Sequence, residues 1–275
     1  MMYGHRFFWC LAAFIVTQIS SAGAEMLPLW EAGAGVAAIS FPDYRGSTRH
    51  RSYVLPVPVF VYRGEVFQMD REKVRGLLLK SERAELDISV NGSVPVRSDG
   101  NPVRQGMPDL DPTLEIGPTI NVALVESARS KLMLRLPLRA VVASDFHSIR
   151  SAGVLLNPNI NLDLKSMRGW RLGLVAGALF ADRKYHDYFY GVAPEYARPG
   201  RAAYRASGGY SGAQFIAALS RRFEPVWVAG FVKYDVINRA AFETSPLVER
   251  RSNLSVGVAV TWMFARSGTR VERNE

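Results

Sequence analysis

Aspartate and histidine side chains in the polar stretches are the residues of this sequence that could support hydrolysis. Asp145 lies two positions before His147, and Asp182 and Asp187 flank His186. A hydrolase needs a nucleophile or a water-activating carboxylate beside a histidine. Pairs of this kind arise freely in polar loops, and the sequence has no glycine-rich phosphate loop and no histidine spacing typical of metal sites. We therefore expect no enzyme, no metal site and no cofactor.

Arginines at alternate positions suggest a second kind of chemistry, the attraction of anions. Arg135 and Arg139 fall on the same face of one alternating stretch, and Arg171 belongs to a later one. If these faces line a pore, their charge favours anions. The alternative is that acidic residues such as Glu115 and Asp163 pair with the arginines and close the lumen.

A polar stretch over residues 181–208 combines aromatic rings with cations. It contains Tyr188, Tyr190, Tyr196, Tyr204, Arg198, Arg201 and Arg205. Two interpretations fit this composition. The rings could cover the end of a barrel, or they could bind a sugar or a headgroup by stacking and cation–π contact.

The elements that must position these residues are predicted by a period of two. From Leu254 to Phe264, large apolar residues alternate with mostly small ones, and the stretch from Trp170 to Phe180 does the same with an aromatic residue at each end. Ten steps of strand span about 33 Å, or about 25 Å of height when the strand is tilted. That height equals the apolar band of an outer-membrane barrel. A soluble β-sandwich also alternates, but its strands average only about 5 to 6 residues.

The fold class predicted is therefore all-β, a transmembrane antiparallel up-and-down β-barrel of twelve strands. Long polar stretches at 41–52, 91–111, 181–208 and 238–252 alternate with tight ones at 126–131, 165–169 and 221–225, as outer loops and periplasmic turns do. A break at 71–73 keeps the strand number even. The predicted strands are 30–39, 53–62, 66–70, 74–80, 85–90, 113–125, 131–142, 152–164, 169–180, 209–220, 226–237 and 253–264.

The first 24 residues are typical of a cleaved secretory signal. Arg6 precedes an apolar run over 7–16, and small residues over 22–24 suit a signal peptidase. The only cysteine, Cys10, lies inside this segment, so the mature chain has no disulfide. Removal of the signal segment, which includes Arg6 and no acidic residue, leaves 33 basic and 25 acidic side chains. The mature chain then has a net charge of +8. We expect residues 25–264 to form the barrel in the outer membrane of a Gram-negative bacterium, and 265–275 to be a short periplasmic tail without regular structure.

Several separated motifs resemble the MipA/OmpV family of outer-membrane proteins. The opening resembles it in residues 30–36, in 42–47, and in 55–58 followed by Tyr62 and Gly64; the later part does so in 188–192, Ala197, 208–210 and 245–248. The match spans nearly the whole mature chain. The loop residues that carry it are Pro42, Asp43, Tyr44, Gly46, Tyr188, Tyr190, Gly191, Tyr204, Ser245, Pro246 and Leu247.

The resemblance implies a non-enzymatic barrel that acts as a binding or scaffold protein in peptidoglycan assembly. Its implied partners are the outer-membrane lipid, a murein lytic transglycosylase and a bifunctional murein synthase. Other members of the family are porins or adhesins, so a small anion-preferring channel or an adhesin is the alternative. We expect a monomer that binds no nucleic acid.

Overall fold

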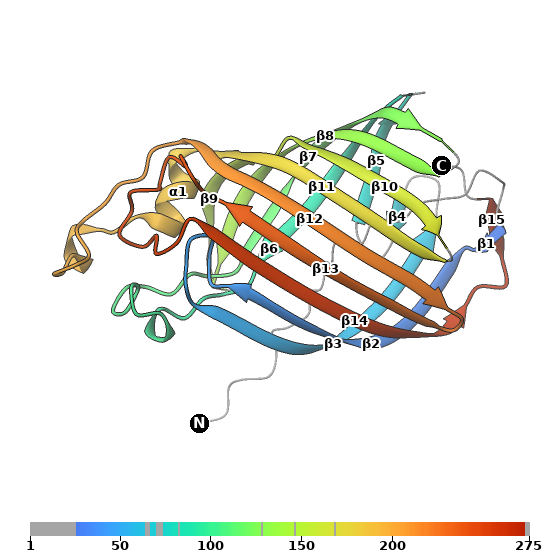
Figure 1. Ribbon diagram of the computed structural model, residues 1–275, viewed down its shortest axis with the longest axis horizontal. Helices are drawn as coiled ribbons and strands as arrows, with labels where there is room; N and C mark the ends of the chain where they lie inside the picture. Colours follow the sequence, from blue (N-terminus) through green and yellow to red (C-terminus); the bar gives the residue numbers. More distant parts are fainter. Residues whose placement is uncertain are drawn as a thin grey trace.

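The computed structural model describes residues 26–63, 67–69, 74–81, 83–127, 129–145, 147–167 and 169–272. They form one large antiparallel sheet and a two-stranded sheet beyond one end of it (Figure 1). The strands of the large sheet are β2 (Trp30–Pro42), β3 (His50–Arg63), β4 (Phe67–Met69), β5 (Val74–Lys80), β6 (Ala84–Ser93), β7 (Thr113–Glu126), β8 (Ser130–Ser144), β9 (Ile149–Leu156), β10 (Asn159–Met167), β11 (Trp170–Ala181), β12 (Gly209–Phe223), β13 (Val226–Val236) and β14 (Ser252–Arg266).

The large sheet closes into a barrel. β8 pairs with both β9 and β10, and β11 pairs with the same two strands, so β9 and β10 follow one another in a single position of the wall. This gives twelve strand positions within the described residues. The last long strand, β14, pairs with the first, β2, from Val256 opposite Ser40 to Arg266 opposite Glu31. The predicted antiparallel barrel is confirmed.

The predicted strand 152–164 is wrong in one respect, because it is interrupted at Asn157 and Pro158. Pro158 has no N–H to donate to the ladder, which favours a break at this point. Its carbonyl still accepts from the N–H of Ala178 at 3.0 Å, and the N–H of Asn157 donates to the Pro137 carbonyl at 3.1 Å. The break therefore leaves the wall connected on both sides.

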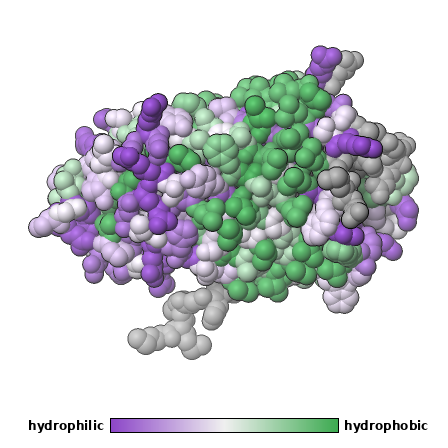
Figure 2. Space-filling model, viewed as in Figure 1, coloured by the Kyte–Doolittle hydropathy of each residue, from purple (hydrophilic) through white to green (hydrophobic). Residues whose placement is uncertain are grey.

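Alternation places apolar residues outward and polar ones inward, as predicted. On β14, Val258, Val260 and Trp262 are 60%, 51% and 59% exposed, whereas Ala259 and Thr261 between them are buried. Figure 2 shows the outer side chains as an apolar belt beside a polar end. Aromatic pairs mark both edges of the belt: Trp30–Phe60, Trp170–Phe223 and Trp262–Phe264 at one edge, and Phe180–Tyr210 at the other. Rings of this kind prefer the two membrane interfaces.

The two ends of the barrel differ as the sequence predicts. Long segments over 43–49, 94–112, 182–208 and 237–251 gather at one end, with helix α1 (Arg183–Tyr190) among them (Figure 1). Short 3-10 turns η1 (Ser98–Gly100) and η2 (Pro194–Tyr196) belong to these segments. The other end carries tight turns such as 224–225, and we call it the turn end. None of the helices in the described residues is long and apolar enough to span a membrane.

The prediction that 265–275 lacks regular structure is wrong for part of it. β14 continues to Arg266, and β15 (Arg270–Glu272) pairs with β1 (Met26–Pro28) to form the small sheet at the turn end. A three-residue strand is too short to show alternation, and its partner lies at the opposite end of the chain. The predicted signal segment 1–24 and the predicted break at 71–73 lie outside the described residues.

Candidate functional site

The motif residues predicted from separate loops converge over the barrel mouth. The hydroxyl of Tyr44 donates to the Leu247 carbonyl at 2.9 Å, and its ring meets that of Tyr190 edge-on at 5.9 Å. Ser245 donates to the Tyr190 carbonyl at 2.7 Å, and the Tyr190 hydroxyl donates to the Arg45 carbonyl at 2.9 Å. Three loops are therefore joined through buried hydrogen bonds.

The stretch after β2 takes a turn conformation that only a glycine adopts without strain. Gly46 has a φ of 94°, and a Cβ placed on it would meet the Ile237 side chain at 2.9 Å. Its N–H donates to the Asn253 side chain at 2.6 Å. The preceding Asp43, just after Pro42, accepts from Arg51 at 2.5 Å. The motif therefore serves as a turn that is fixed by hydrogen bonds.

The remaining motif residues fix the loop that follows β11. Gly191 ends α1, where its N–H donates to the Asp187 carbonyl at 2.9 Å. Val192 and Tyr204 form an antiparallel bridge, and the Tyr204 hydroxyl lies 3.5 Å from the Ala241 carbonyl. Pro246 is half-buried between Ser245 and Leu247.

These contacts surround an apolar core that we call the mouth cluster. Its centre is the face-to-face stack of Tyr190 on Phe242, with ring centroids 3.6 Å apart and planes 6° from parallel. Burial raises the pKa of the Tyr44 and Tyr190 hydroxyls above their ordinary value, so both stay protonated donors. The buried members of the cluster are Tyr44, Val96, Leu110, Tyr190, Val192, Ala206, Ile237, Ala240, Phe242 and Leu247.

A buried histidine lies against the mouth cluster. His186 is fully buried and packs edge-on against Phe242 at 4.9 Å. Its Nδ1 lies 2.5 Å from the Ser207 carbonyl, which can only accept, so Nδ1 carries the proton and Nε2 accepts from the Ser211 hydroxyl. Desolvation, assisted by the charge of Arg45, lowers the pKa of His186 below its ordinary value of 6.5.

Helix α1 lies across the mouth of the barrel. Asp182 caps it by accepting from the Tyr185 N–H at 2.8 Å. A Cβ on Gly153 of β9 would meet the Tyr185 backbone nitrogen at 2.5 Å, so glycine lets the helix rest on the wall. Burial raises the pKa of Tyr185, and this ring also feels the charges of Glu115 on β7 and Asp235 on β13. The helix is thus held against β9 and, through the hydroxyls of Tyr188 and Tyr190, bonded to the carbonyls of Asp111 and Arg45 in two other loops.

The predicted lumen cations have partners. Arg139 forms an ion pair with Glu115 at 3.5 Å and donates to Ser89 at 3.0 Å. Arg135 donates to Asn121 at 2.9 Å. Arg171, on β11 opposite Ser220, is not free either. Of the three arginines, Arg139 is thus paired with Glu115, an acidic residue that the closed-lumen alternative named.

Two further ion-pair groups in the lumen were missed by the sequence interpretation. Near the turn end, Glu31 is 1% exposed and binds Arg63 at 2.6 Å and Arg222 at 2.5 Å. Below the mouth, Asp235 binds Arg45 at 3.1 Å and Lys233 at 3.2 Å. The sequence did contain a signal for these groups. Glu31 and Asp235 are carboxylates at inward-facing positions of their strands, where a charged residue needs a partner.

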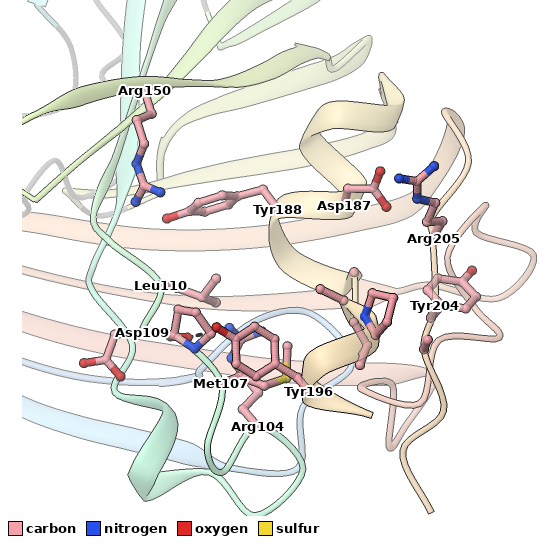
Figure 3. Close-up of a pocket in the computed structure, with 16 residues that line it drawn as sticks. Arg104, Met107, Asp109, Leu110, Arg150, Asp187, Tyr188, Tyr196, Tyr204 and Arg205 are labelled. Atoms are coloured by element: carbon pink, nitrogen blue, oxygen red, sulfur yellow. Dashed lines mark hydrogen bonds between the residues drawn. The ribbon is translucent and has the colours of Figure 1, made fainter. Parts of the chain in front are cut away.

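Outside the mouth cluster, the loops enclose a cleft of about 550 Å³, which we call the outer cleft (Figure 3). Tyr188 projects into it from α1, and its hydroxyl donates to the Asp111 carbonyl at 3.0 Å. Burial raises the pKa of Tyr188 to about 12. The other aromatic and charged residues around the outer cleft are Tyr196, Tyr204, Arg104, Arg150, Arg205, Asp109 and Asp187.

The Asp and His pairs weighed as hydrolytic groups have structural contacts instead. Asp145 accepts from the backbone N–H groups of His147 and Ser148, and these bonds lower its pKa. Asp182 caps α1, and His186 is buried against Ser211. Within the described residues, no group of three His, Cys, Asp or Glu side chains is arranged to hold a metal ion.

The model of the family described as MltA-interacting protein MipA matches residues 34–264. This chain belongs to the MipA family. The match begins inside β2 and ends inside β14, so it covers nearly the whole wall of this MipA-family barrel and the loops of the mouth cluster.

Solved structures of outer-membrane proteins are similar to it at low identity. An outer membrane channel from Pseudomonas putida F1 is 12% identical, with 90% of this chain and 100% of that chain covered and a TM-score of 0.45. The channel DcaP of Acinetobacter baumannii is 10% identical, with 92% and 100% covered and a TM-score of 0.37. Phospholipase A from Escherichia coli is 11% identical, with 86% and 93% covered and a TM-score of 0.32. A search of curated proteins gave no match.

Proposed function

We propose that this MipA-family protein is a non-enzymatic binding and scaffold barrel of the outer membrane whose lumen does not conduct. It is exported by its signal segment, acts as a monomer and holds periplasmic murein enzymes near the membrane. The partners proposed are a lytic transglycosylase and a bifunctional murein synthase, linked in peptidoglycan assembly.

One observation carries this proposal: the loops of the polar end pack into a buried core over the barrel mouth. A porin keeps its mouth open, whereas here Tyr190 and Phe242 stack over it and α1 is bonded to the loops on several sides of it. Below this core, the predicted lumen cations are engaged by Glu115, Asn121 and other groups. Both features favour a binding protein over a channel.

The partner is proposed from the family description, which names an interaction with MltA. Periplasmic enzymes approach a barrel from its periplasmic side, which we assign to the turn end. There β1 and β15 form a short ribbon beyond the wall, and within the described residues neither strand pairs with a third one. We propose the ribbon as part of the docking surface.

The experiment is a pull-down of the tagged protein from detergent-solubilised envelopes. We expect murein lytic and synthetic enzymes in the eluate, and less of them for a chain truncated after Arg266, which lacks β15. The matched control is Lys184→Ala, an exposed change at the opposite end of the barrel. Absence of murein enzymes, combined with steady conductance that weakens in Arg135→Glu, would support the anion-preferring channel instead.

A further inference from the structure

We propose that the outer cleft binds an anionic saccharide, a sugar unit that carries phosphate or carboxylate. This inference concerns the loop end of the barrel and is independent of the murein enzymes proposed for the turn end. The outer cleft, at about 550 Å³, falls within the range of about 300 to 1,000 Å³ that is usual for small-molecule sites.

The aromatic residues of the outer cleft are held in place before any ligand arrives. Tyr188 is fixed through its hydroxyl, and Tyr204 lies 3.3 Å from the Thr244 hydroxyl. The Tyr196 backbone is fixed because its carbonyl accepts two hydrogen bonds from Arg201, at 3.0 and 2.7 Å, and its side chain packs against the mouth cluster. Rigid tyrosines offer flat, amphipathic contact area at low entropic cost, which suits the apolar face of a sugar ring.

The two buried arginines near the outer cleft form no ion pair with a carboxylate among the described residues. Arg104 is 3% exposed and donates to Ser98 Oγ and to the carbonyls of Pro108 and Phe189. Behind the cleft, Arg201 is 5% exposed and likewise donates to carbonyls. Carbonyl acceptors satisfy the donors and leave the charge in place, so these buried guanidinium groups create a field that attracts anions.

Arg205 is positioned to meet the charged group of a ligand. It is exposed at the rim of the outer cleft, and among the described residues it forms no ion pair, although Asp187 faces it in Figure 3. Asp187 is engaged with the Ala206 N–H at 2.6 Å and can still accept hydrogen bonds from sugar hydroxyls. A guanidinium fork matches phosphate and carboxylate in geometry and charge.

The remaining charges do not cancel this preference. Arg150 forms an ion pair with Asp111, so that pair is neutral. Asp109 accepts from the Ser98 N–H at 2.7 Å and is the second unpaired carboxylate at the cleft. Of the other charged residues that line the cleft, Arg104 and Arg205 equal Asp109 and Asp187 in number, and Arg201 behind the cleft adds one further positive charge.

The ligand could come from two sources that share this chemistry, the phosphorylated core of lipopolysaccharide or an acidic glycan from outside the cell. The test uses the purified full-length protein in detergent and isothermal titration calorimetry. The probes are deacylated, phosphorylated core oligosaccharide, a carboxylated oligogalacturonate, and neutral maltotriose. We expect one or both acidic probes to bind at least tenfold more tightly than maltotriose, and the probe that binds identifies the source.

Variants decide whether the outer cleft is responsible. Arg205→Ala should weaken binding of the acidic probe about tenfold, because one charge-assisted contact is lost. Tyr196→Ala should also weaken it, while Arg49→Ala, an exposed arginine on another loop, should leave it unchanged. Unchanged heat-modifiable gel mobility, together with unchanged tryptic protection at Arg201, shows that a variant is folded. The proposal is overturned if no acidic probe binds, if maltotriose binds equally well, or if Arg205→Ala binds like the wild type.

Discussion

Replacing Tyr190 by alanine should open the mouth cluster and leave the barrel wall intact. Tyr190 is 3% exposed, stacks on Phe242 and donates to the Arg45 carbonyl. Truncation of a buried aromatic residue costs about 3 to 5 kcal/mol. Because about 1.4 kcal/mol corresponds to a factor of ten, the open population of the loops should rise roughly 10² to 4 × 10³-fold. Tyr190→Phe keeps the stack and loses one hydrogen bond worth about 1 kcal/mol, which predicts about a fivefold rise.

The assay is limited trypsin digestion of the purified protein, which can cut after Arg201 and Arg205 only when the loop opens. Heat-modifiable gel mobility follows the barrel wall in the same samples. Tyr234→Ala, a change on the lipid-facing side of β13, is the matched control and should leave the loop cleavage rate unchanged. The reasoning is refuted if Tyr190→Ala is cleaved at the wild-type rate, or if the wall melts together with the loops.

Three other changes test the wall, the lumen and the mouth. Leu174→Arg, on the lipid-facing side of β11, should lower the free energy of unfolding in detergent–lipid micelles by about 2 to 4 kcal/mol, as a cation near the midplane does. Glu31→Ala should lower the free energy of unfolding by about 3 kcal/mol in the same assay, because Arg63 and Arg222 lose the carboxylate between them. This value is the low end of the range of about 3 to 5 kcal/mol for a broken buried ion pair, since the two arginine side chains keep 19% and 31% exposure. Acidification below about pH 6.5 should speed tryptic cleavage of the loops, because the opened loop then binds a proton at His186 that the closed cluster disfavours.

Each of these expectations has an outcome that contradicts it. A tolerated Leu174→Arg together with a strongly destabilising arginine at Val175 would mean that the register is shifted by one residue. A neutral effect of Glu31→Ala would mean that water in the lumen screens the two arginines. For the pH effect, His186→Gln is the control, and cleavage that accelerates equally in this variant would assign the effect to another group.

The wall of the barrel was predictable because its signal is local. Alternation in β14 and in β11 needs only neighbouring residues to be read, and aromatic residues at both ends of β11 and at the turn end of β14 mark the membrane interfaces. The break at Pro158 was also visible in the sequence, yet the alternation on both sides of it continues in phase and favoured one strand. The β1–β15 pairing was not visible, because three-residue strands carry no pattern.

The candidate site was predictable as a set of residues and not as an arrangement. The motif loops were identified, but Tyr44 and Leu247 are 203 positions apart, and nothing in either motif specifies that they bond. The same limit applies to Glu31 and Arg222, which are 191 positions apart. Their pairing is created by barrel closure, since closure brings inward residues of distant strands to one height in the lumen.

Single-channel recording in planar lipid bilayers tests the central claim, that the mouth cluster and the lumen ion pairs close this barrel. The wild-type protein should insert and give no steady conductance, while Tyr190→Ala should give intermittent openings as its loops unfold. Heat-modifiable mobility confirms that each sample is a folded barrel before recording. Steady, anion-selective steps from the wild-type protein that weaken in Arg135→Glu would contradict the account and establish an open channel.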